Sequence, residues 1–320
     1  MKTILILIPL FLLVSFPQNE KTNNDWEKDK LKGKVKILKQ DKYYTHEKAG
    51  KVVMGEKVRG NEHNFLKSYN DKGLLTEMTD YFPYSGPAEK KLCKYDDTGK
   101  LIEIKEYTIG DTLTCISTFK YDTKGNKIEK SRNFQREKLI GKETWKYDLK
   151  NNCIQYNDYN FSGGLSLKWT YKYDNKGNQT EWNCFDGKGA DNGKYTYSYN
   201  ENNRCTEMKK FEKGNKLEEV HFYYYDEVGN KTARKVSYPG KNREEVETWQ
   251  YDDKGNMTES KQEGGLYRTY GYTYEYDSQG NWTKRTQVEN DFQDWNPKTK
   301  KMESRNNVPV AITLRTIEYY

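Results

Sequence analysis

The apolar residues Leu, Ile, Val and Phe are scarce in this sequence. Leu, Ile, Val and Phe account for 56 of its 320 residues, and there are only 7 Pro and 3 His. This composition excludes an ordinary helical protein with a Leu-rich core, and equally a membrane protein with several spans. The 55 basic and 48 acidic residues leave a charge of +7 and alternate in sign, so no basic face for nucleic acid is expected. Aromatic residues are plentiful instead: 28 Tyr and 7 Trp can bury the area that aliphatic side chains would have covered.

Motifs for chemistry are equally scarce. There is no phosphate-binding glycine loop, nucleophile elbow or zinc-protease helix, and His46, His63 and His221 lack the spacing of a metal site. The sequence therefore predicts no enzyme, no cofactor and no metal. The odd number of cysteines, without a C-x-x-C pair, leaves room for one disulfide and at least one free thiol. Burial as small apolar residues is the favoured role of these five: Cys93, Cys115, Cys153, Cys184 and Cys205.

The N-terminus has the organisation of an export signal. Lys2 is followed by an apolar run over residues 4–14, which is shorter than the roughly 20 residues that a bilayer span needs. We predict an export signal over residues 1–16 and a polar, mobile leader over residues 17–30. An uncleaved N-terminal anchor is the alternative. The mature chain is then expected to be exported, to the periplasm, the cell surface or the medium, and to have no membrane span.

A short motif, Tyr-Asp-x-x-Gly-Asn, recurs along most of the chain. Its tyrosines, which we call the repeat tyrosines, follow one another at intervals of 26 residues, except for a last interval of 25. The period defines nine units over residues 63–290 and is a strict internal repeat. The repeat tyrosines are Tyr69, Tyr95, Tyr121, Tyr147, Tyr173, Tyr199, Tyr225, Tyr251 and Tyr276.

Each unit has the residues of a β-hairpin. The Asp after the tyrosine can accept hydrogen bonds from amides two residues on, and the Gly four places after the tyrosine supplies the positive φ that ends the turn. Calcium binding by these Asp residues is the weaker alternative, because each turn has one Asp whereas Ca²⁺ takes six or more oxygen ligands. The flanking segments are rich in Tyr, Thr and Trp and alternate as strands do.

One strand register sorts the side chains into two faces. If each repeat tyrosine lies opposite the residue seven places on, as Tyr121 would oppose Ile128, the aromatic residues two places before each tyrosine share its face. The other face then pairs Lys with Glu, as in Lys120 and Glu129. A slip of one residue would mix the two faces, so the pattern favours this register.

A sheet with one aromatic face has to curl until that face is turned inward. We therefore predict an all-β fold of tandem antiparallel β-hairpin repeats with a period of 26 residues, curled into a roll, spiral or barrel-like sheet. Residues 31–62 are expected to form an N-terminal β cap and residues 308–320 a C-terminal capping strand, with an irregular connector over residues 291–307.

The motif resembles the YD repeat of the Rhs family, which is also found in teneurins and in the shells of insecticidal toxin complexes. The match weakens at Tyr147 and Tyr199, where no Gly ends the turn. With its cap segment over residues 31–36, the chain is most similar to small exported YD-repeat proteins of Bacteroidetes-type bacteria. The resemblance implies a roll of β-hairpins. In the large relatives this roll encloses a toxic cargo, but no effector segment is recognised after Tyr276, so a toxin function is not expected.

Function is predicted from the two edges of the repeat array. The motif turns are nearly identical, whereas the loops at the opposite edge vary freely, as residues 82–87 and 161–164 illustrate. We expect a non-enzymatic scaffold or interaction module that binds an unknown protein or polysaccharide at the cell envelope. The alternative is a glycan-binding module in which Trp169 and Trp182 stack on sugar rings. An enzyme would require a pair of carboxylates that the fold encloses.

Overall fold

The computed structural model describes residues 24–49, 51–58, 63–82, 86–108, 110–135, 139–264, 267–290, 292–296 and 301–320, and the predicted export signal over residues 1–16 lies outside them. The helix α1 covers Asp25–Lys28, and no helix in these ranges is long and apolar enough to cross a lipid bilayer. The strands are β1 (Val35–Lys48), β2 (Lys51–Lys57), β3 (Phe65–Tyr69), β4 (Leu75–Phe82), β5 (Gly86–Tyr95), β6 (Leu101–Thr108), β7 (Thr112–Tyr121), β8 (Lys127–Phe134), β9 (Leu139–Tyr147), β10 (Cys153–Tyr159), β11 (Leu165–Tyr173), β12 (Gln179–Asp186), β13 (Asp191–Tyr199), β14 (Cys205–Glu212), β15 (Lys216–Tyr225), β16 (Lys231–Tyr238), β17 (Arg243–Tyr251), β18 (Met257–Glu263), β19 (Arg268–Tyr276), β20 (Trp282–Asn290), β21 (Phe292–Asn296), β22 (Lys301–Arg305) and β23 (Val308–Tyr319).

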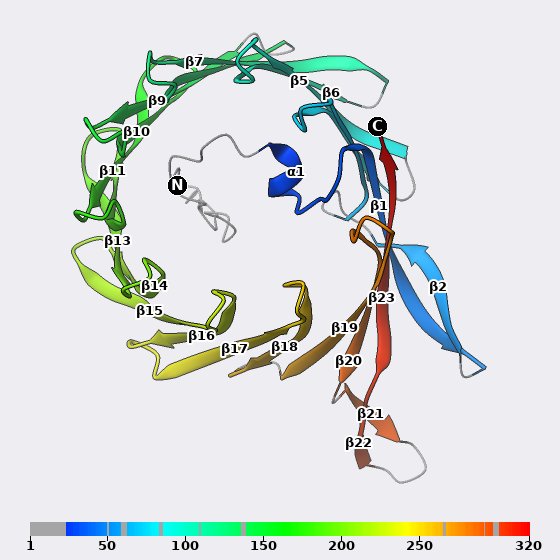
Figure 1. Ribbon diagram of the computed structural model, residues 1–320. Helices are drawn as coiled ribbons and strands as arrows, with labels where there is room; N and C mark the ends of the chain where they lie inside the picture. The colour runs from blue at the N-terminus through cyan, green and yellow to red at the C-terminus, as the bar shows by residue number, and fades with distance from the viewer. Residues whose placement is uncertain are drawn as a thin grey trace, which may run out of the picture.

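The strands form a closed antiparallel barrel (Figure 1). Each strand from β3 to β20 pairs with the next in the chain, β20 pairs with β23, β23 with β1 and β1 with β3, so that 20 strands close a ring. The predicted all-β fold of hairpin repeats is confirmed, and of the three forms considered the chain adopts the barrel. Strands about 4.8 Å apart give such a ring a perimeter of roughly 100 Å. The interior of a barrel of this size is too wide for side chains to fill.

Both ends of the described chain take part in this closure. The predicted N-terminal cap contains β1 and β2, which form a hairpin, and the predicted capping strand is β23. Strands β1 and β23 pair from Val35 opposite Tyr319 to Tyr44 opposite Ala311. We call this closing pair the seam.

The structure differs from the sequence expectation in two segments that flank the repeats. The sequence predicts a mobile leader over residues 17–30, of which residues 17–23 lie outside the described ranges; residues 24–30 form α1 and its flanking turns, where Trp26 is buried and its indole N–H donates to Val35 O at 2.7 Å. The sequence also predicts an irregular connector over residues 291–307, but β21 and β22 pair there as a hairpin. The hairpin gives the backbone groups of this segment the partners that an irregular chain would lack.

The motif turns have the chemistry expected of them. Asp122 Oδ1 accepts a hydrogen bond from the amide of Asn126 at 2.8 Å, and Gly125 has a φ of +89°. The carboxylate thus accepts hydrogen bonds within its own turn, as predicted for the Asp of the motif. In the two units without Gly, Asn151 and Asn203 take its place with φ of +64° and +58°, since Asn tolerates the left-handed region.

The predicted register is correct within the strands and off by one at the tyrosines. Lys120 pairs with Glu129, as expected. Tyr121, however, lies opposite Lys127, six places on, and not opposite Ile128, because the register shifts between Lys120 and Tyr121. Such a bulge sets two residues of one strand against one of its partner. It recurs beside the motif turn of every repeat and so belongs to the unit.

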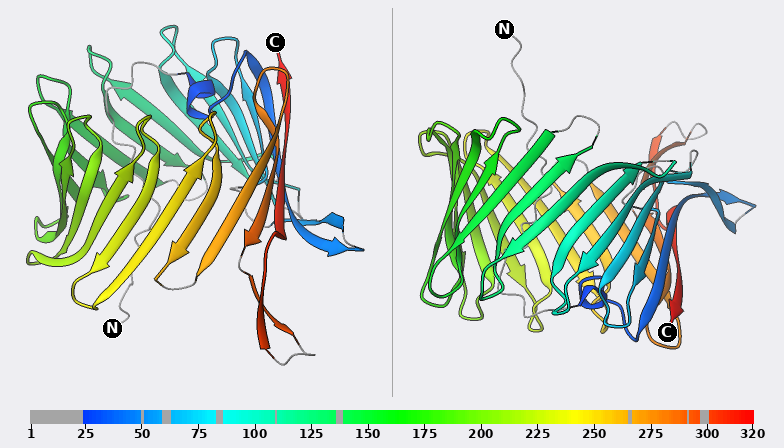
Figure 2. Two further views of the ribbon diagram at one scale, coloured as in Figure 1. Left: turned by 60° about the horizontal axis from the view of Figure 1, so that its bottom comes forward. Right: turned by 90° about the horizontal axis from the view of Figure 1, so that it is seen from above.

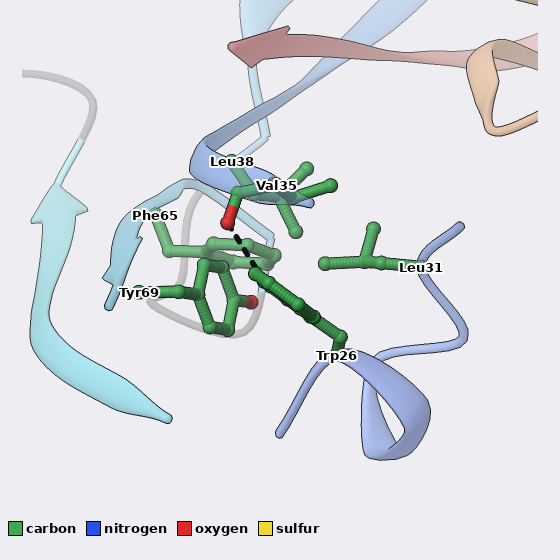
Figure 3. Packing of buried hydrophobic residues seen from close by; sticks show 6 residues of the cluster. All are labelled: Trp26, Leu31, Val35, Leu38, Phe65 and Tyr69. Carbon is green, nitrogen blue, oxygen red and sulfur yellow. Dashed lines mark hydrogen bonds between the residues drawn. The ribbon is translucent and has the colours of Figure 1, made fainter. Parts of the chain in front are cut away.

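The repeat tyrosines face the inside of the barrel. The helix α1 lies within the ring near one rim (Figures 1 and 2), and its Trp26 packs with Phe65 and Tyr69, the first repeat tyrosine (Figure 3). Since side chains alternate along a strand, the residues two and four places before each tyrosine also face inward. The residue just before the tyrosine faces outward, where Lys120 Nζ lies 2.7 Å from Glu129. The aromatic face therefore points inward, as predicted.

A packed apolar core lies where α1 meets the seam (Figure 3). Its members are Trp26, Leu31, Val35, Leu38, Phe65 and Tyr69. Along the repeats the inward-facing aromatic residues are half-buried instead, Trp169 and Trp182 among them. The aromatic residues of the repeats thus line the inner wall of the barrel, whereas the fully buried apolar cluster lies where the ring closes.

The repeat tyrosines tie each hairpin to the one before it. Tyr173 Oη donates to the carbonyl of Cys153 at 2.7 Å, and Cys153 is the bulge residue that lies opposite Tyr147. The pairing of β10 with β11 begins at Gln155, so the hydroxyl reaches a carbonyl beyond the end of that pairing and gives it a hydrogen-bond partner. The bond recurs at 2.7–2.9 Å in what we call the tyrosine ladder: Tyr95, Tyr121, Tyr147, Tyr173, Tyr199, Tyr225 and Tyr251.

The last repeat shows how the ladder depends on the period. Tyr276 follows its predecessor by 25 residues, and its Oη donates to Asp252 Oδ2 at 3.0 Å. Tyr274 donates to the carbonyl of Met257 in its stead, at 2.9 Å. Met257 lies opposite Tyr251 and is the bulge residue of the preceding hairpin. In this shorter unit, the hydrogen bond to the carbonyl of the preceding hairpin therefore comes from a tyrosine two places earlier than the repeat tyrosine.

Replacing Tyr173 with Phe should lower the free energy of unfolding by about 1–2 kcal/mol, because the carbonyl of Cys153 loses its donor. Tyr224 is the matched control, since it is 53% exposed. Tyr224→Phe should change the free energy of unfolding by less than about 0.5 kcal/mol. Urea unfolding followed by circular dichroism measures both values. Equal effects of the two substitutions would contradict the role of the ladder.

Alkaline pH should destabilise the barrel. Burial raises the pKa of the ladder tyrosines, Tyr121 and Tyr173 among them, above the ordinary value of about 10. The folded state therefore holds protons that the unfolded state has lost, so stability is complete below about pH 10 and falls as the pH rises beyond it. Melting temperatures measured from about pH 8 to about pH 12, with phenolate absorbance as the record of ionisation, test this. A constant melting temperature while the unfolded chain ionises would refute it.

Candidate interaction surfaces

Five aromatic side chains form a continuous row across the inner wall from β9 to β13. The ring centroids of Trp145 and Tyr156 are 5.3 Å apart, and those of Tyr156 and Trp169 are 4.7 Å apart. The row continues from Trp169 to Trp182 at 5.3 Å and ends with Tyr195 at 4.6 Å. Strand register produces it, because Tyr156 lies opposite Trp145 on one side and Trp169 on the other. This aromatic row brings together the two tryptophans predicted to stack on sugars.

Neighbouring rings of the row cover part of one another's faces. Tyr156 and Trp169 are stacked with 29° between their planes, and Trp182 and Tyr195 with 13°. Each such pair contributes about 0.5–1.5 kcal/mol beyond the burial of its area. The buried indole N–H of Trp182 has no hydrogen-bond partner in the described part of the chain. Sugar stacking by Trp169 and Trp182 stays a prediction, in which a ligand would meet ring edges and this N–H group.

Two carboxylates face each other beside the aromatic row. Glu143 of β9 pairs with Asp158 of β10, and burial, followed by the charge of Glu143, raises the pKa of Asp158. Glu143 lies 3.5 Å from Lys130 Nζ and 3.3 Å from an Arg132 terminal nitrogen. The register inferred from the sequence already places the two carboxylates opposite each other. Charged residues recur in every repeat, however, so the pattern did not single them out.

The two rims of the barrel differ as the sequence predicts. The motif turns lie at one rim, together with α1, and the loops between repeats lie at the other (Figure 2). We call these the motif rim and the loop rim. Two turns at the loop rim copy the motif turn: Asn160 accepts from the amide of Gly164, and Asp186 from that of Ala190, both at 2.9 Å. The loop rim therefore keeps some ordered turns despite its varied sequence.

Two hairpins extend beyond the ring at the loop rim (Figures 1 and 2). One is β21–β22, and the other is formed by β2 and the second half of β1. Within the described ranges β2 pairs with β1 alone, so its other edge carries backbone groups without a strand partner. Val52 and Met54 of β2 are 49% and 48% exposed, and Tyr44 of β1 is 52% exposed. The hairpin thus combines a free strand edge with exposed apolar side chains.

The histidines and cysteines do not come together in one site within the described ranges. There, no three His, Cys, Asp or Glu side chains come together as ligands for a metal ion. His46 is in β1 and His221 in β15, so these two histidines stay apart. All five cysteines are free thiols. Burial raises the pKa of Cys93, Cys153 and Cys205 to about 11, which keeps these thiols protonated and unreactive.

Comparison with known proteins gives no family. No family model matches the sequence, and no curated protein matches it. Similar solved structures include a porin-like protein from Bacteroides uniformis ATCC 8492, with a TM-score of 0.35 at 10% identity over 89% of this chain and 98% of that chain. They also include the TcdB2–TccC3–Cdc42 structure, with a TM-score of 0.24 at 11% identity, and the Photorhabdus luminescens Tc holotoxin pore, with a TM-score of 0.20 at 12% identity.

These structural similarities are weak. The two toxin structures match 78% and 76% of this chain, which spans only 20% and 19% of theirs. TM-scores this low support no argument about function. The resemblance to YD-repeat proteins is compatible with the hairpin fold and stays an expectation, since no family model confirms it.

Proposed function

We propose that the protein is a non-enzymatic exported scaffold that holds a protein partner at the loop rim of its barrel. The β1–β2 hairpin is the observation that supports this best, because it leaves the ring with a free strand edge and with Val52 and Met54 exposed. A closed ring has no free edges of its own. A strand that escapes it offers donors and acceptors with which an extended segment of a partner can pair.

The outer wall supports a barrel that works in water. Its outward rows carry ion pairs, as Lys120 and Lys142 lie 2.7 Å from Glu129, and Lys172 lies 2.7 Å from Glu181. A barrel embedded in lipid presents an outward apolar band instead. The proposal therefore includes a mature chain that does not span a membrane. With the export signal predicted over residues 1–16, the envelope or the cell exterior is the place where it meets its partner.

A photo-crosslinking amino acid at position 54 should capture the partner in cells that export the chain. Met54 lies on the exposed face of β2, so we expect one covalent adduct of defined mass. The matched control is position 149, because Leu149 is 93% exposed but belongs to a motif turn at the opposite rim. Adding Val52→Lys to the Met54 probe should abolish the adduct, since a charge on an edge strand opposes strand addition.

The outcomes of this experiment are distinct. An adduct at position 54 that is absent at position 149 and lost with Val52→Lys supports the scaffold. Equal labelling at both positions, or none at either, would overturn it. An adduct with the mass of two copies of this chain would replace the foreign partner with self-association.

A second candidate function is glycan binding along the inner wall. The aromatic row and the neighbouring pair of Glu143 and Asp158 favour it, because saccharide sites combine aromatic surface with a few fixed polar groups. The same pair could also serve acid–base chemistry, because burial and the charge of Glu143 raise the pKa of Asp158. One experiment distinguishes these readings from an inner wall that is purely structural.

Envelope and plant polysaccharides titrated into the purified chain should quench its Trp fluorescence if the inner wall binds glycans. Trp182→Ala should then weaken binding by roughly tenfold or more, whereas Tyr224→Ala on the outer wall should leave it unchanged. Release of reducing ends that Asp158→Asn abolishes would show that the non-enzymatic assignment is wrong. An unchanged signal with every saccharide would leave the row a structural feature.

A further inference from the structure

A cavity of ≈ 350 Å³ lies at the motif rim next to the seam. Its walls come from the connector after α1 (residues 29–32), from the last two motif turns and from Arg315 of β23. The connector is fastened to the last turn, because Asn281 Oδ1 accepts from Lys32 N at 2.7 Å and Asn281 Nδ2 donates to Lys32 O at 2.8 Å. These two bonds fix one wall of the cavity against another.

Positive side chains dominate the lining. Its one carboxylate, Asp29, is already engaged by Lys67 Nζ at 2.6 Å and by Tyr69 Oη at 2.5 Å. Within the described part of the chain no carboxylate lies within ion-pair distance of the lining cations. The cavity therefore has an excess of positive charge, which Asp29 offsets only in part. The four cations are Lys30, Lys32, Lys254 and Arg315.

Two of these cations are held by aromatic rings. The guanidinium carbon of Arg315 lies 3.7 Å from the ring centroid of Trp282, and Lys254 Nζ lies 3.7 Å from that of Tyr276. Arg315 also donates from Nε to Gln40 Oε1 at 3.0 Å. A ring orients a cation but does not cancel its charge, and the remaining N–H groups stay free to donate.

More positive charge lies on the inner wall beside the cavity. Burial lowers the pKa of Arg315 to about 10; the charge of Asp29 opposes this shift and that of Arg285 adds to it. Burial, followed by the charge of Arg285, also lowers the pKa of Lys42. A lowered pKa means that the environment disfavours the charged form of a cation, and a bound anion would reverse this. The charge of this region therefore favours a bound anion, because Asp29 supplies only part of the opposite charge.

We propose that this cavity binds an oxyanion, a carboxylate or a phosphate, carried on a ligand about the size of a monosaccharide. The guanidinium of Arg315 and the ammonium of Lys254 are fixed donors for charge-assisted hydrogen bonds. The volume lies near the lower end of the range for small-molecule sites. The proposal is independent of the partner at the loop rim, because cavity and β2 lie at opposite rims.

Calorimetric titration of the full exported chain with glucuronate, glucose 6-phosphate, inorganic phosphate and glucose tests the site at low salt. We expect saturable binding of the sugar acid or the sugar phosphate, none of glucose, and weaker binding as NaCl is added. Arg315→Gln and Lys254→Gln should each weaken binding roughly tenfold or more. Lys172→Gln is the matched control, because its ammonium sits in an ion pair on the outer wall and should not affect binding.

The outcomes decide the proposal. Lys254 belongs to a surface turn, so its substitution serves even if Arg315→Gln proves unfolded by circular dichroism. Binding of inorganic phosphate as tight as that of glucose 6-phosphate would assign the site to free phosphate and remove the sugar from the proposal. No heat with either anionic sugar, or unchanged binding in the Lys254→Gln protein, would overturn it.

Discussion

The hydrogen bond from a repeat tyrosine to a carbonyl of the preceding hairpin is the constraint on which the fold depends. Its acceptor lies before the first residue at which the two hairpins pair as strands, and the tyrosine of the next hairpin supplies the donor. A unit of another length carries the hydroxyl elsewhere, as the last interval shows, where Tyr274 replaces Tyr276 at the carbonyl of Met257. The interval of 26 residues is thus the one at which the repeat tyrosine itself reaches this carbonyl.

The barrel consequently holds together without a central core. Its interior is too wide for side chains to fill, and the half-buried rings of Trp169 and Trp182 are stabilised by stacking on Tyr156 and Tyr195 of the neighbouring strands. Closure requires more, because β1 and β23 come from opposite ends of the repeat array. The buried cluster around Trp26 lies at that place, and it joins the helix, the first repeat and the seam. Local bonds thus stabilise the repeats, and apolar burial stabilises their closure.

Features that depend on a single repeat could be predicted from the sequence, whereas features that depend on all the repeats together could not. Asp122 and Gly125 specify the turn, and Lys120 opposite Glu129 specifies the register, because these contacts lie within a single hairpin. The bulge at Tyr121 was missed because a shift of one residue at a turn leaves the alternation beyond it intact. Closure of the ring depends on the accumulated twist of many strands, which no local sequence pattern reveals. The cavity beside Arg315 is lined by residues from both ends of the described chain, so it could not be predicted from a local pattern either.

The pairing of Val35 with Tyr319 also determines the order of assembly. The hairpins join residues that are close in sequence, and each can add to its predecessor as the chain emerges. The pairing of β1 with β23, by contrast, joins residues whose separation in sequence is close to the length of the chain. Before β23 is available the curled sheet has two open edges, which are competent to pair with a neighbouring molecule. Ring formation accordingly has to wait until β23 has been synthesised.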